Sequence, residues 1–471
     1  MLKDKIIVLG VTGGIAAYKA ADLASKLTQA GAKVRVVMTK SGTEFVQPMT
    51  FEALTGNPVV TEMYGPKAPH GITHITLADT ADVVVIAPAT ANIIAKIASG
   101  IADDMLTCVV LATKAPVVIA PAMHNNMYTN PITQENIQKL KKRGFHIIPA
   151  AHGRLASGDI GYGRLPDVSE IIGHIQTVLG KKGDFTGRRA VVTAGGTQEA
   201  IDPVRFISNR SSGKMGYAVA EAARDRGAQV TLITAPTSLP DPVGVEMVKI
   251  KSIVQMRDAV VKAVQKTDIL IMSAAGADFI PKTTATQKIK KSDAGLTLEL
   301  VKAPDILTEI KDGKFIKVGF KAETQNLVDN AREKLYKTNL DLIVANDVTK
   351  EGSGFGTDTN EVTIINKKGE PENLPLMSKR EVADKILDRV VKLLILPTNT
   401  NTEFAPRSKR VTAGDFNYEG DGIFSLRSDA SVIINAKLPG KIIKEHLAQR
   451  GYLNSSINSF RWSLRKRAAL I

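Results

Sequence analysis

The feature that most constrains this chain is a pattern that occurs twice: a short apolar run, a pair of glycines, and a segment with helical spacing. The first copy begins with KIIVLGVTGG at 5–14 and the second with RRAVVTAGGT at 188–197. Continuous apolar strands joined by helices are typical of parallel sheets that are buried on both faces. We therefore predict an α/β fold with two doubly wound, Rossmann-like domains.

Each copy continues in the same way, which sets the domain bounds that we predict. GAKVRVVMTKS corresponds to GAQVTLITAPT, and TADVVVIAPAT corresponds to KTDILIMSAAG. Two units of this length indicate two separate nucleotide-fold domains and not a solenoid. We predict a first domain, a linker, a second domain that closes with a helix, and a basic tail of unassigned role, over 1–180, 181–189, 190–396 and 397–471.

The composition of this 471-residue chain indicates the cellular compartment in which it works. The single cysteine, Cys108, excludes an intramolecular disulfide and is typical of a reducing compartment. No apolar run reaches the roughly 20 residues that a membrane span needs, and Gly13–Gly14 interrupts the apolar start. We predict a soluble, cytoplasmic protein without membrane contact.

The formal net charge of +15 suits either nucleic acid or phosphorylated small molecules. The tail alone holds 12 Lys and Arg against 6 Asp and Glu, so the body is only moderately basic. Such a body is expected for pockets that hold phosphates. We therefore favour small phosphorylated ligands, and we do not expect a nucleic-acid partner.

In the first domain, Gly13–Gly14 lies between a predicted strand and a predicted helix. Small residues there let backbone N–H groups and the helix N-terminus approach a phosphate, although a tight turn would look the same. Thr39 and Ser41 follow the next strand and can donate to the same phosphate. His74 precedes the third strand; a lone histidine is more often structural, but its near-neutral pKa suits proton transfer.

Four ordered motifs make residues 5–175 resemble the flavin-dependent cysteine decarboxylase family. They are HITL at 74–77, APATANIIAKIASGIADDMLT at 87–107, PAMHNNMY at 121–128 and ASGDIGYGR at 156–164. The resemblance implies a flavodoxin-like fold with FMN as its cofactor and His74 as the proton carrier. It places FMN on Gly14, Thr39, Ser41, Ala91, Asn92 and Ala122.

The resemblance also implies a chemistry in which the flavin takes a hydride from the cysteinyl Cβ. The resulting thioaldehyde accepts the electrons that are released when carbon dioxide leaves, and the flavin then reduces the ene-thiol. Ser157 stands where some members carry the cysteine that gives the last proton, and His124 stands where many have a carboxylate-binding asparagine. His124 or Asn125 can take the latter role. The Gly-rich stretch 153–164 is predicted to be a flap over the site, or else an ordinary surface loop.

The most informative stretch of the second domain is TAGGTQEAIDPVRFISNRSSGKMG at 193–216. Its residues from Asn209 to Lys214 form a dense array of anion-binding donors before a helix. The spacing is not that of a Walker loop. These residues predict a nucleotide or phosphate site, with a solvated turn as the alternative.

With this stretch, six further motifs make residues 188–395 resemble the phosphopantothenate-cysteine ligase family. They are SAAGADF, KIKK, KAPDI, VGFKAET, ANDV and GFGTDTN. The resemblance implies that CTP, with Mg²⁺, forms an acyl-cytidylate that Asn209 holds. It also implies that Lys288 stabilises the anionic transition state. Without the resemblance, Lys288 would be read as part of a solvated basic face. The resemblance implies nucleotide contacts at Ala274, Asp278, Pro304, Asp305, Ile306, Phe320 and Lys334.

Taken together, the two resemblances imply a bifunctional enzyme of coenzyme A biosynthesis. It would join cysteine to 4'-phosphopantothenate and then decarboxylate the product to 4'-phosphopantetheine. The resemblances also imply homo-oligomers, with flavin sites at subunit interfaces and paired ligase domains. Two alternatives stay open: an active ligase whose first domain is an oxidative decarboxylase, and a first domain that is a non-catalytic regulatory module.

Overall fold

The computed structural model describes residues 2–64, 73–291 and 296–395, together with three short strands of the tail. The chain forms two compact units, Met1–Leu396 and Pro397–Ile471, and both predicted domains lie in the first unit. The tail strands are β20 (Phe416–Tyr418), β21 (Ile423–Leu426) and β22 (Ile434–Asn435). The other tail residues lie outside the described part. No helix of the described part is long and apolar enough to cross a membrane.

The first sheet has the strand order β2-β1-β3-β4-β5, and all of its strands are parallel. This is the order of flavodoxin-like folds, so the predicted fold class of the first domain is confirmed. The strands are β1 (Ile6–Val11), β2 (Lys33–Met38), β3 (Val83–Ala89), β4 (Val117–Pro121) and β5 (His146–Ile147).

Helices cover both faces of this sheet because successive strand residues point to opposite sides. Ile7 and Leu9 pack with α1 and α9 on one face, and Val8 packs with α4, α5, α6 and α8 on the other. The helices of this domain are α1 (Ala17–Gln29), α2 (Lys40–Thr43), α3 (Pro48–Thr55), α4 (His74–Thr80), α5 (Ala91–Ser99), α6 (Met105–Ala112), α7 (Asn125–Thr129), α8 (Pro131–Lys142) and α9 (Val168–Gly180).

The second sheet has the order β12-β11-β8-β13-β16-β17-β18-β19. Its first six strands are parallel and follow the Rossmann order 3-2-1-4-5-6, while β18 and β19 are antiparallel additions. The strands are β8 (Arg189–Ala194), β11 (Gln229–Thr234), β12 (Glu246–Lys249), β13 (Ile269–Met272), β16 (Ile316–Glu323), β17 (Leu342–Asp347), β18 (Thr359–Asn366) and β19 (Pro371–Ser378).

Alternation along β8 again divides the core into two. Ala190 and Val192 pack with α10 and α14 on one face, and Val191 packs with α11, α12 and α13 on the other. The helices are α10 (Lys214–Asp225), α11 (Ile253–Ala263) with a 3₁₀ turn at Val264–Lys266, α12 (Ile306–Glu309), α13 (Leu327–Lys337) and α14 (Lys379–Ile395).

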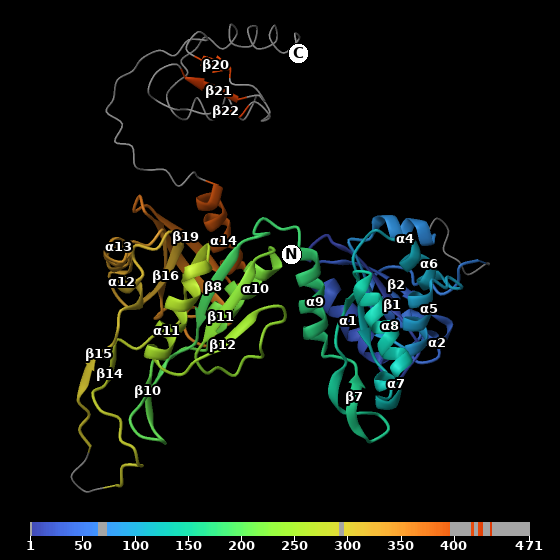
Figure 1. Cartoon of the computed structure of the whole chain (residues 1–471), viewed down its shortest axis with the longest axis horizontal. Coiled ribbons are helices and arrows are strands. Elements are labelled where there is room, and N and C mark those ends of the chain that lie inside the picture. The colour runs from blue at the N-terminus through green and yellow to red at the C-terminus, as the bar shows by residue number, and fades with distance from the viewer. Residues whose placement is uncertain are drawn as a thin grey trace. The chain divides into compact units, whose positions relative to one another are not determined.

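Three two-stranded pairs project from the sheets and matter for the sites. β6 (Ala151–Arg154) and β7 (Ile160–Arg164) form a hairpin, so the predicted flap at 153–164 is itself a β-hairpin. β9 (Gln198–Ala200) pairs with β10 (Phe206–Ser208), and β14 (Phe279–Pro281) pairs with β15 (Leu300–Lys302). Figure 1 shows that β10, β14 and β15 extend from the same side of the second sheet.

Candidate active sites

The first candidate site lies where the strand order of the first sheet reverses, between β1 and β3. Ligands of doubly wound sheets bind at the carboxyl ends of the strands at such a point. The buried Thr12 hydroxyl donates to the Pro88 carbonyl oxygen at 2.7 Å and accepts from the Thr90 N–H at 3.2 Å. These bonds tie together the two loops that border the switch point.

The glycine turn after β1 fits a phosphate group. A Cβ on Gly13 would come within 2.5 Å of the Ser41 Cβ, so glycine is required for this close approach. Gly14 has φ +153° and open space where a side chain would stand. Helix α1 begins three residues later, at Ala17, without a side-chain cap, which leaves N–H groups for an anion.

The other residues predicted to hold FMN follow the neighbouring strands. Thr39 caps α2 by accepting from the Gly42 N–H at 3.2 Å, with Ser41 in the same turn. Ala91 and Asn92 open helix α5, and the Ala122 N–H donates to the Ala89 carbonyl oxygen at 2.9 Å. The structure therefore brings all six predicted positions to the carboxyl ends of β1, β2, β3 and β4.

The β6–β7 hairpin joins the predicted substrate residues to Ser157. Asp159 Oδ2 accepts from the Ser157 hydroxyl at 3.0 Å and lies 3.3 Å from His124 Nε2. Asn125 Oδ1 accepts from the Tyr162 N–H at 2.9 Å, which holds the hairpin against the start of α7. The hydrogen bond from Ser157, then that from His124, holds the pKa of Asp159 below its usual range.

Asp159 was not among the predicted site residues. It links the two positions where this chain departs from the decarboxylase pattern, Ser157 and His124. The sequence offered one signal, an acidic residue two positions after Ser157 in ASGDIGYGR. Only the fold shows that the same carboxylate also reaches His124, 35 residues away in the chain.

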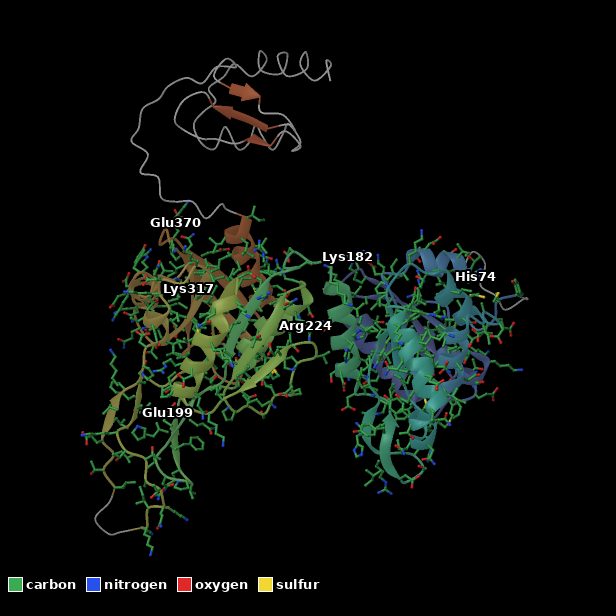
Figure 2. All side chains as sticks on the ribbon, in the orientation of Figure 1. His74, Lys182, Glu199, Arg224, Lys317 and Glu370 are labelled. Atoms are coloured by element: carbon green, nitrogen blue, oxygen red, sulfur yellow. The ribbon has the colours of Figure 1, made fainter. Side chains whose placement is uncertain are left out.

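His74 lies apart from these residues within one chain. It is the first residue of α4, where the Thr73 hydroxyl caps the helix by accepting from the Thr76 N–H at 3.1 Å. Figure 2 shows His74 on α4, away from the β6–β7 hairpin that Figure 1 labels at β7. Among the described residues, no hydrogen bond joins His74 to the hairpin or to the predicted FMN positions.

The second candidate site is a cavity of about 960 Å³ at the reversal point of the second sheet, between β8 and β13. It lies at the carboxyl ends of the strands, where doubly wound sheets bind their ligands. The predicted residues that line it are Asn209, Ala274, Asp278, Pro304, Asp305, Ile306, Phe320 and Lys334.

Three hydrogen bonds fix the loops at the floor of this cavity. The Thr193 hydroxyl accepts from the Ala274 N–H at 3.1 Å, and the Thr197 hydroxyl accepts from the Ala277 N–H at 3.0 Å. Asn209 Nδ2 donates to the Gly276 carbonyl oxygen at 2.8 Å. Asn209 is thereby oriented by the loop that follows β13.

Helix α10 begins at the same cavity and supplies its anion-binding end. Its N-cap, Gly213, has φ +77° and makes no side-chain cap, so the first N–H groups of this helix can bind an anion. Lys214 Nζ donates to Asp358 Oδ1 at 2.7 Å and to the Gly356 carbonyl oxygen at 2.8 Å. This lysine therefore holds the loop before β18 close to the helix start.

Two lysines, the half-buried Lys334 and the buried Lys379, add positive charge to the cavity lining. Lys334 Nζ donates to the Phe320 carbonyl oxygen at 3.0 Å, and burial, then Lys321, lowers the pKa of Lys334. Lys379 is 7% exposed and donates to the Gly354 carbonyl oxygen and the Thr357 hydroxyl, each at 3.2 Å. Sequence reasoning missed Lys379, because MSKREV looks like an ordinary helix start.

Thr338 and Lys288 differ in their position relative to this cavity. Thr338 lines the cavity beside Lys337, and its hydroxyl donates to the Lys334 carbonyl oxygen at 2.7 Å. Lys288 is exposed on the segment between β14 and β15 and is not among the cavity-lining residues. The structure therefore does not bring Lys288 to the cavity of its own chain.

A second cavity, of about 1030 Å³, opens at the amino ends of the strands in the second sheet. Arg189, Gln229 and Glu246 line it, and it contains no predicted site residue. Its position at the amino ends makes it a poor candidate for the nucleotide. Among the described residues, no three His, Cys, Asp or Glu side chains gather closely enough to hold a metal ion.

Two doubly wound sheets, each with an anion-binding turn at its switch point, define a two-site α/β protein that binds phosphorylated ligands. Residues 1–180 match the family described as Flavoprotein, and residues 185–394 match the DNA/pantothenate metabolism flavoprotein C-terminal domain.

The coenzyme A biosynthesis bifunctional protein CoaBC of Bacillus subtilis (strain 168) is 49% identical over 398 residues, which cover 83% of this chain and 98% of that protein. The protein of the same name from Vibrio cholerae is 46% identical over 391 residues, covering 82% of this chain and 98% of that one. The chain belongs to the family of these coenzyme A biosynthesis bifunctional proteins.

One solved structure, the C-terminal domain of a coenzyme A biosynthesis bifunctional protein CoaBC, is 40% identical to this chain. It aligns with a TM-score of 0.39 and covers 45% of this chain and 98% of its own.

Proposed function

We propose that this chain catalyses two consecutive steps of coenzyme A biosynthesis, a CTP-dependent ligation in the second domain and an FMN-dependent decarboxylation in the first. The proposal is supported by one observation: at the point where its strand order reverses, each sheet gathers the residues predicted for one of the two reactions. Six predicted flavin positions gather at one, and eight predicted ligase positions line the cavity at the other. The domain bounds, 1–180 and 190–396, and a cytoplasmic location remain part of this proposal.

In the ligation, a carboxylate oxygen of 4'-phosphopantothenate attacks the α-phosphorus of CTP, and the bond to pyrophosphate breaks. The cysteine amine then attacks the acyl carbon, loses a proton and displaces CMP. The α10 N-terminus and Lys334 face the charge of the phosphates, while Asn209, fixed by Gly276, holds the acyl-cytidylate. Mg²⁺ enters with the nucleotide, since it binds mainly through phosphate oxygens and few protein ligands.

In the decarboxylation, Gly14, Thr39, Ser41, Ala91, Asn92 and Ala122 would hold FMN, which when bound would supply a reversible two-electron oxidation at the cysteinyl Cβ. The chain's own part is to hold the phosphate at Gly13–Gly14, to bind the substrate carboxylate, and to move protons. The carboxylate would be bound by His124 and Asn125, which both contact the hairpin. Loss of carbon dioxide leaves an electron pair that the thioaldehyde carbon–sulfur system takes up.

The last step requires one proton at the former α-carbon. Ser157 is the residue of the hairpin that we assign to deliver it, and Asp159 fixes the Ser157 hydroxyl at 3.0 Å. A serine hydroxyl is a much weaker acid than a thiol, so the proton must pass from water or from His124 through this hydrogen-bonded group. The contact between Asp159 and His124 provides such a connection.

We also propose that the working form is a homo-oligomer. His74 and Lys288 each lie away from the site that they are assigned to serve, so a second copy must bring them there. Large apolar side chains are exposed around the glycine turn, the hairpin and the β10 and β14–β15 projections, which favours a partner at these places. They are Ile15, Tyr18, Ile160, Phe206, Phe279 and Leu296.

A second candidate function rests on Ser157. If the last proton is not delivered, the first domain is an oxidative decarboxylase that releases an ene-thiol, and only the ligase belongs to coenzyme A biosynthesis. A non-catalytic first domain is the remaining alternative. Both differ from the main proposal in the product that the first domain releases.

The test is to inactivate each site separately in the full chain. Asn209→Ala should abolish formation of phosphopantothenoylcysteine but leave decarboxylation of that compound when it is supplied. Gly13→Ala should do the reverse and also remove the visible flavin absorbance, because its Cβ would collide with Ser41. If either substitution stops both reactions in a folded protein, the assignment of one reaction to each domain is wrong.

A further inference from the structure

The segment that carries Lys288 has almost no side-chain packing of its own. We call residues 282–291, which follow β14, the lysine arm. All of its side chains are exposed except the half-buried Ala285 and Ile289. An arm of this kind cannot hold a lysine in one place through apolar packing. What fixes Lys288 must therefore be its backbone contacts.

Those contacts run to the β9–β10 turn, and they centre on one buried carboxylate. Asp202 Oδ2 accepts from the Ile289 N–H at 3.2 Å, and Arg205 Nη2 donates to the Ile289 carbonyl oxygen at 2.6 Å. Both backbone groups of the residue after Lys288 are thus bound by this pair. Nearer the base of the arm, the Ala285 N–H donates to the Ile201 carbonyl oxygen at 3.0 Å.

Asp202 also determines the shape of the turn that receives the arm. Its Oδ1 accepts from the N–H groups of Val204 and Arg205, each at 2.8 Å, and its Oδ2 accepts from Arg205 Nε at 2.9 Å. The Asp202 side chain is fully buried, whereas that of Arg205 is 43% exposed. A buried carboxylate with four donors is rigid, since every oxygen is satisfied and none can move without losing a partner.

Burial alone would raise the pKa of Asp202. The hydrogen bonds from the N–H groups of Val204, Arg205 and Ile289, and from the Arg205 side chain, outweigh burial and hold this pKa well below its usual range. The carboxylate is therefore ionised throughout the pH range in which the enzyme is assayed, and the arm contact is a charged hydrogen bond.

We propose that Asp202 is a positioning residue of the ligase reaction, which clamps the lysine arm through Ile289 so that Lys288 reaches the anionic transition state. This inference rests on the role proposed for Lys288. Asp202 touches neither substrate nor nucleotide, and it is not among the residues that line the cavity. Its effect is exerted on the rate of the chemical step and not on nucleotide binding.

The test is Asp202→Asn in the full chain. The new side-chain amide N–H₂ group is a donor, and it would face the Ile289 N–H and the Arg205 donors in place of a carboxylate oxygen. We expect ligase kcat to fall about 10²-fold, as small misplacements of a catalytic group do. We expect KM for CTP to change little, and trypsin to cleave after Lys288, Lys290 or Lys291 faster than in the parent. Decarboxylation of supplied phosphopantothenoylcysteine should be unchanged.

A matched control is Asp268→Asn. Asp268 also binds a backbone N–H and an arginine, through Arg189 at 2.8 Å and Arg188 at 3.2 Å, but at the amino end of the sheet. It should leave ligase kcat and the cleavage of the arm as in the parent.

A double-mutant cycle with Lys288→Ala separates positioning from general destabilisation. If Asp202 acts through Lys288, Asp202→Asn should not lower ligase kcat any further in the Lys288→Ala background. Losses that multiply would overturn the proposal, and so would parent-like kcat in Asp202→Asn while Lys288→Ala is impaired. If Lys288→Ala itself keeps full ligase activity, the role assigned to Lys288 falls, and the inference about Asp202 falls with it.

Discussion

Lys334 is the residue whose protonation most directly links the second site to pH. Burial, with Lys321 nearby, lowers its pKa from the ordinary lysine value, while Asp278, Asp305 and Glu323 oppose the shift. As pH rises through this lowered pKa, the ammonium is lost at a lower pH than for an exposed lysine. A triphosphate ligand then loses one cationic partner.

We therefore expect kcat/KM for CTP to fall as pH rises over the range below the ordinary lysine pKa. Lys334→Arg keeps its charge, because arginine is not deprotonated in proteins, so its profile should lack this alkaline limb. Lys385→Arg on α14 serves as the control and should follow the parent. An identical alkaline limb in the parent and in Lys334→Arg would show that Lys334 does not hold the nucleotide.

At the residue scale, local motifs predicted the site residues that directly follow a strand. They missed the residues that reach a site from distant parts of the chain. Gly14, Thr39 and Asn92 each follow a strand of the first parallel sheet, so their gathering could be predicted from the rule for parallel sheets. Lys379 could not, because it reaches the cavity from the start of a helix far along the chain. Asp159 and Asp202 act through partners in other segments, which no local pattern reveals.

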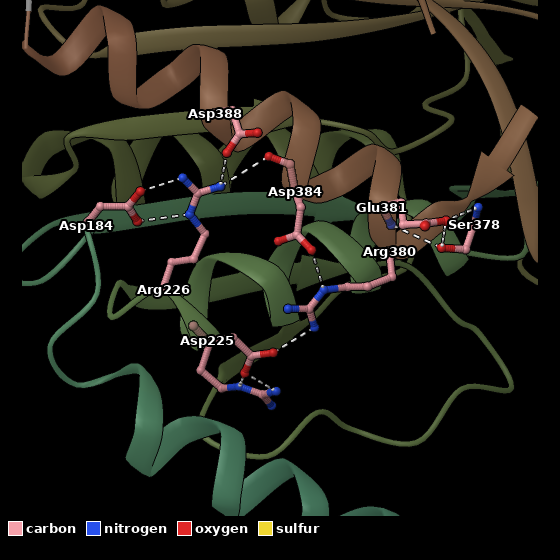
Figure 3. A network of polar contacts seen from close by, with 9 residues as sticks. Asp184, Asp225, Arg226, Ser378, Arg380, Glu381, Asp384 and Asp388 are labelled. Atoms are coloured by element: carbon pink, nitrogen blue, oxygen red, sulfur yellow. Dashed lines mark hydrogen bonds and ion pairs between the residues drawn. The ribbon is translucent and has the colours of Figure 1, made fainter. Parts of the chain in front are cut away.

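At the scale of elements, a buried charge network holds α10 against α14 (Figure 3). Asp225, at the end of α10, is fully buried and accepts from Arg224 Nε at 2.8 Å and from Arg380 Nη1 at 2.7 Å. Arg226 donates to Asp388 Oδ1 at 2.9 Å and to Asp184 Oδ1 at 2.9 Å. Arg224 and Arg226 at the end of α10 and Arg380 at the start of α14 are thus linked through a few carboxylates.

Replacing Asp225 with asparagine should destabilise the second domain, because it leaves the buried Arg224 guanidinium without its carboxylate partner, while the partly exposed Arg380 keeps Asp384. Removing one partner of a buried ion pair typically costs about 3–5 kcal/mol. Urea denaturation followed by circular dichroism measures this loss as a lower midpoint. Asp241→Asn, which breaks the exposed pair between Asp241 and Lys249, is the control and should cost less than about 1 kcal/mol. Equal midpoints for both variants would contradict the role assigned to Asp225.

The elements themselves were largely predictable, whereas their ends and additions were not. The helical segment predicted after the first glycine pair is α1, Ala17–Gln29, and its first residue depends on the conformation of the glycine turn. Helix α11 ends in a 3₁₀ turn at Val264–Lys266, which the sequence pattern did not reveal. The flap or loop predicted at 153–164 is the β6–β7 hairpin, whose two strands pair across a short turn. The sequence there carries no strong β signal, so the pairing could not be predicted.

At the scale of the whole molecule, the two units differ in what they are expected to contribute. All residues assigned to either reaction lie in Met1–Leu396, and none lies in Pro397–Ile471. We predict that a chain ending at 396 keeps both activities within about twofold of the parent, because no residue assigned to either reaction lies beyond 396. Loss of either activity in a folded truncated protein would show that the tail completes a site.

The central claim is that one chain carries both reactions to 4'-phosphopantetheine. The most direct test is mass spectrometry of the products formed by the purified full-length protein from phosphopantothenate, cysteine, CTP and Mg²⁺. We expect 4'-phosphopantetheine, because its formation requires both sites and the last protonation at Ser157. Accumulated phosphopantothenoylcysteine, or an ene-thiol two hydrogens lighter than 4'-phosphopantetheine, would contradict it and leave only the ligase, or a ligase joined to an oxidative decarboxylase.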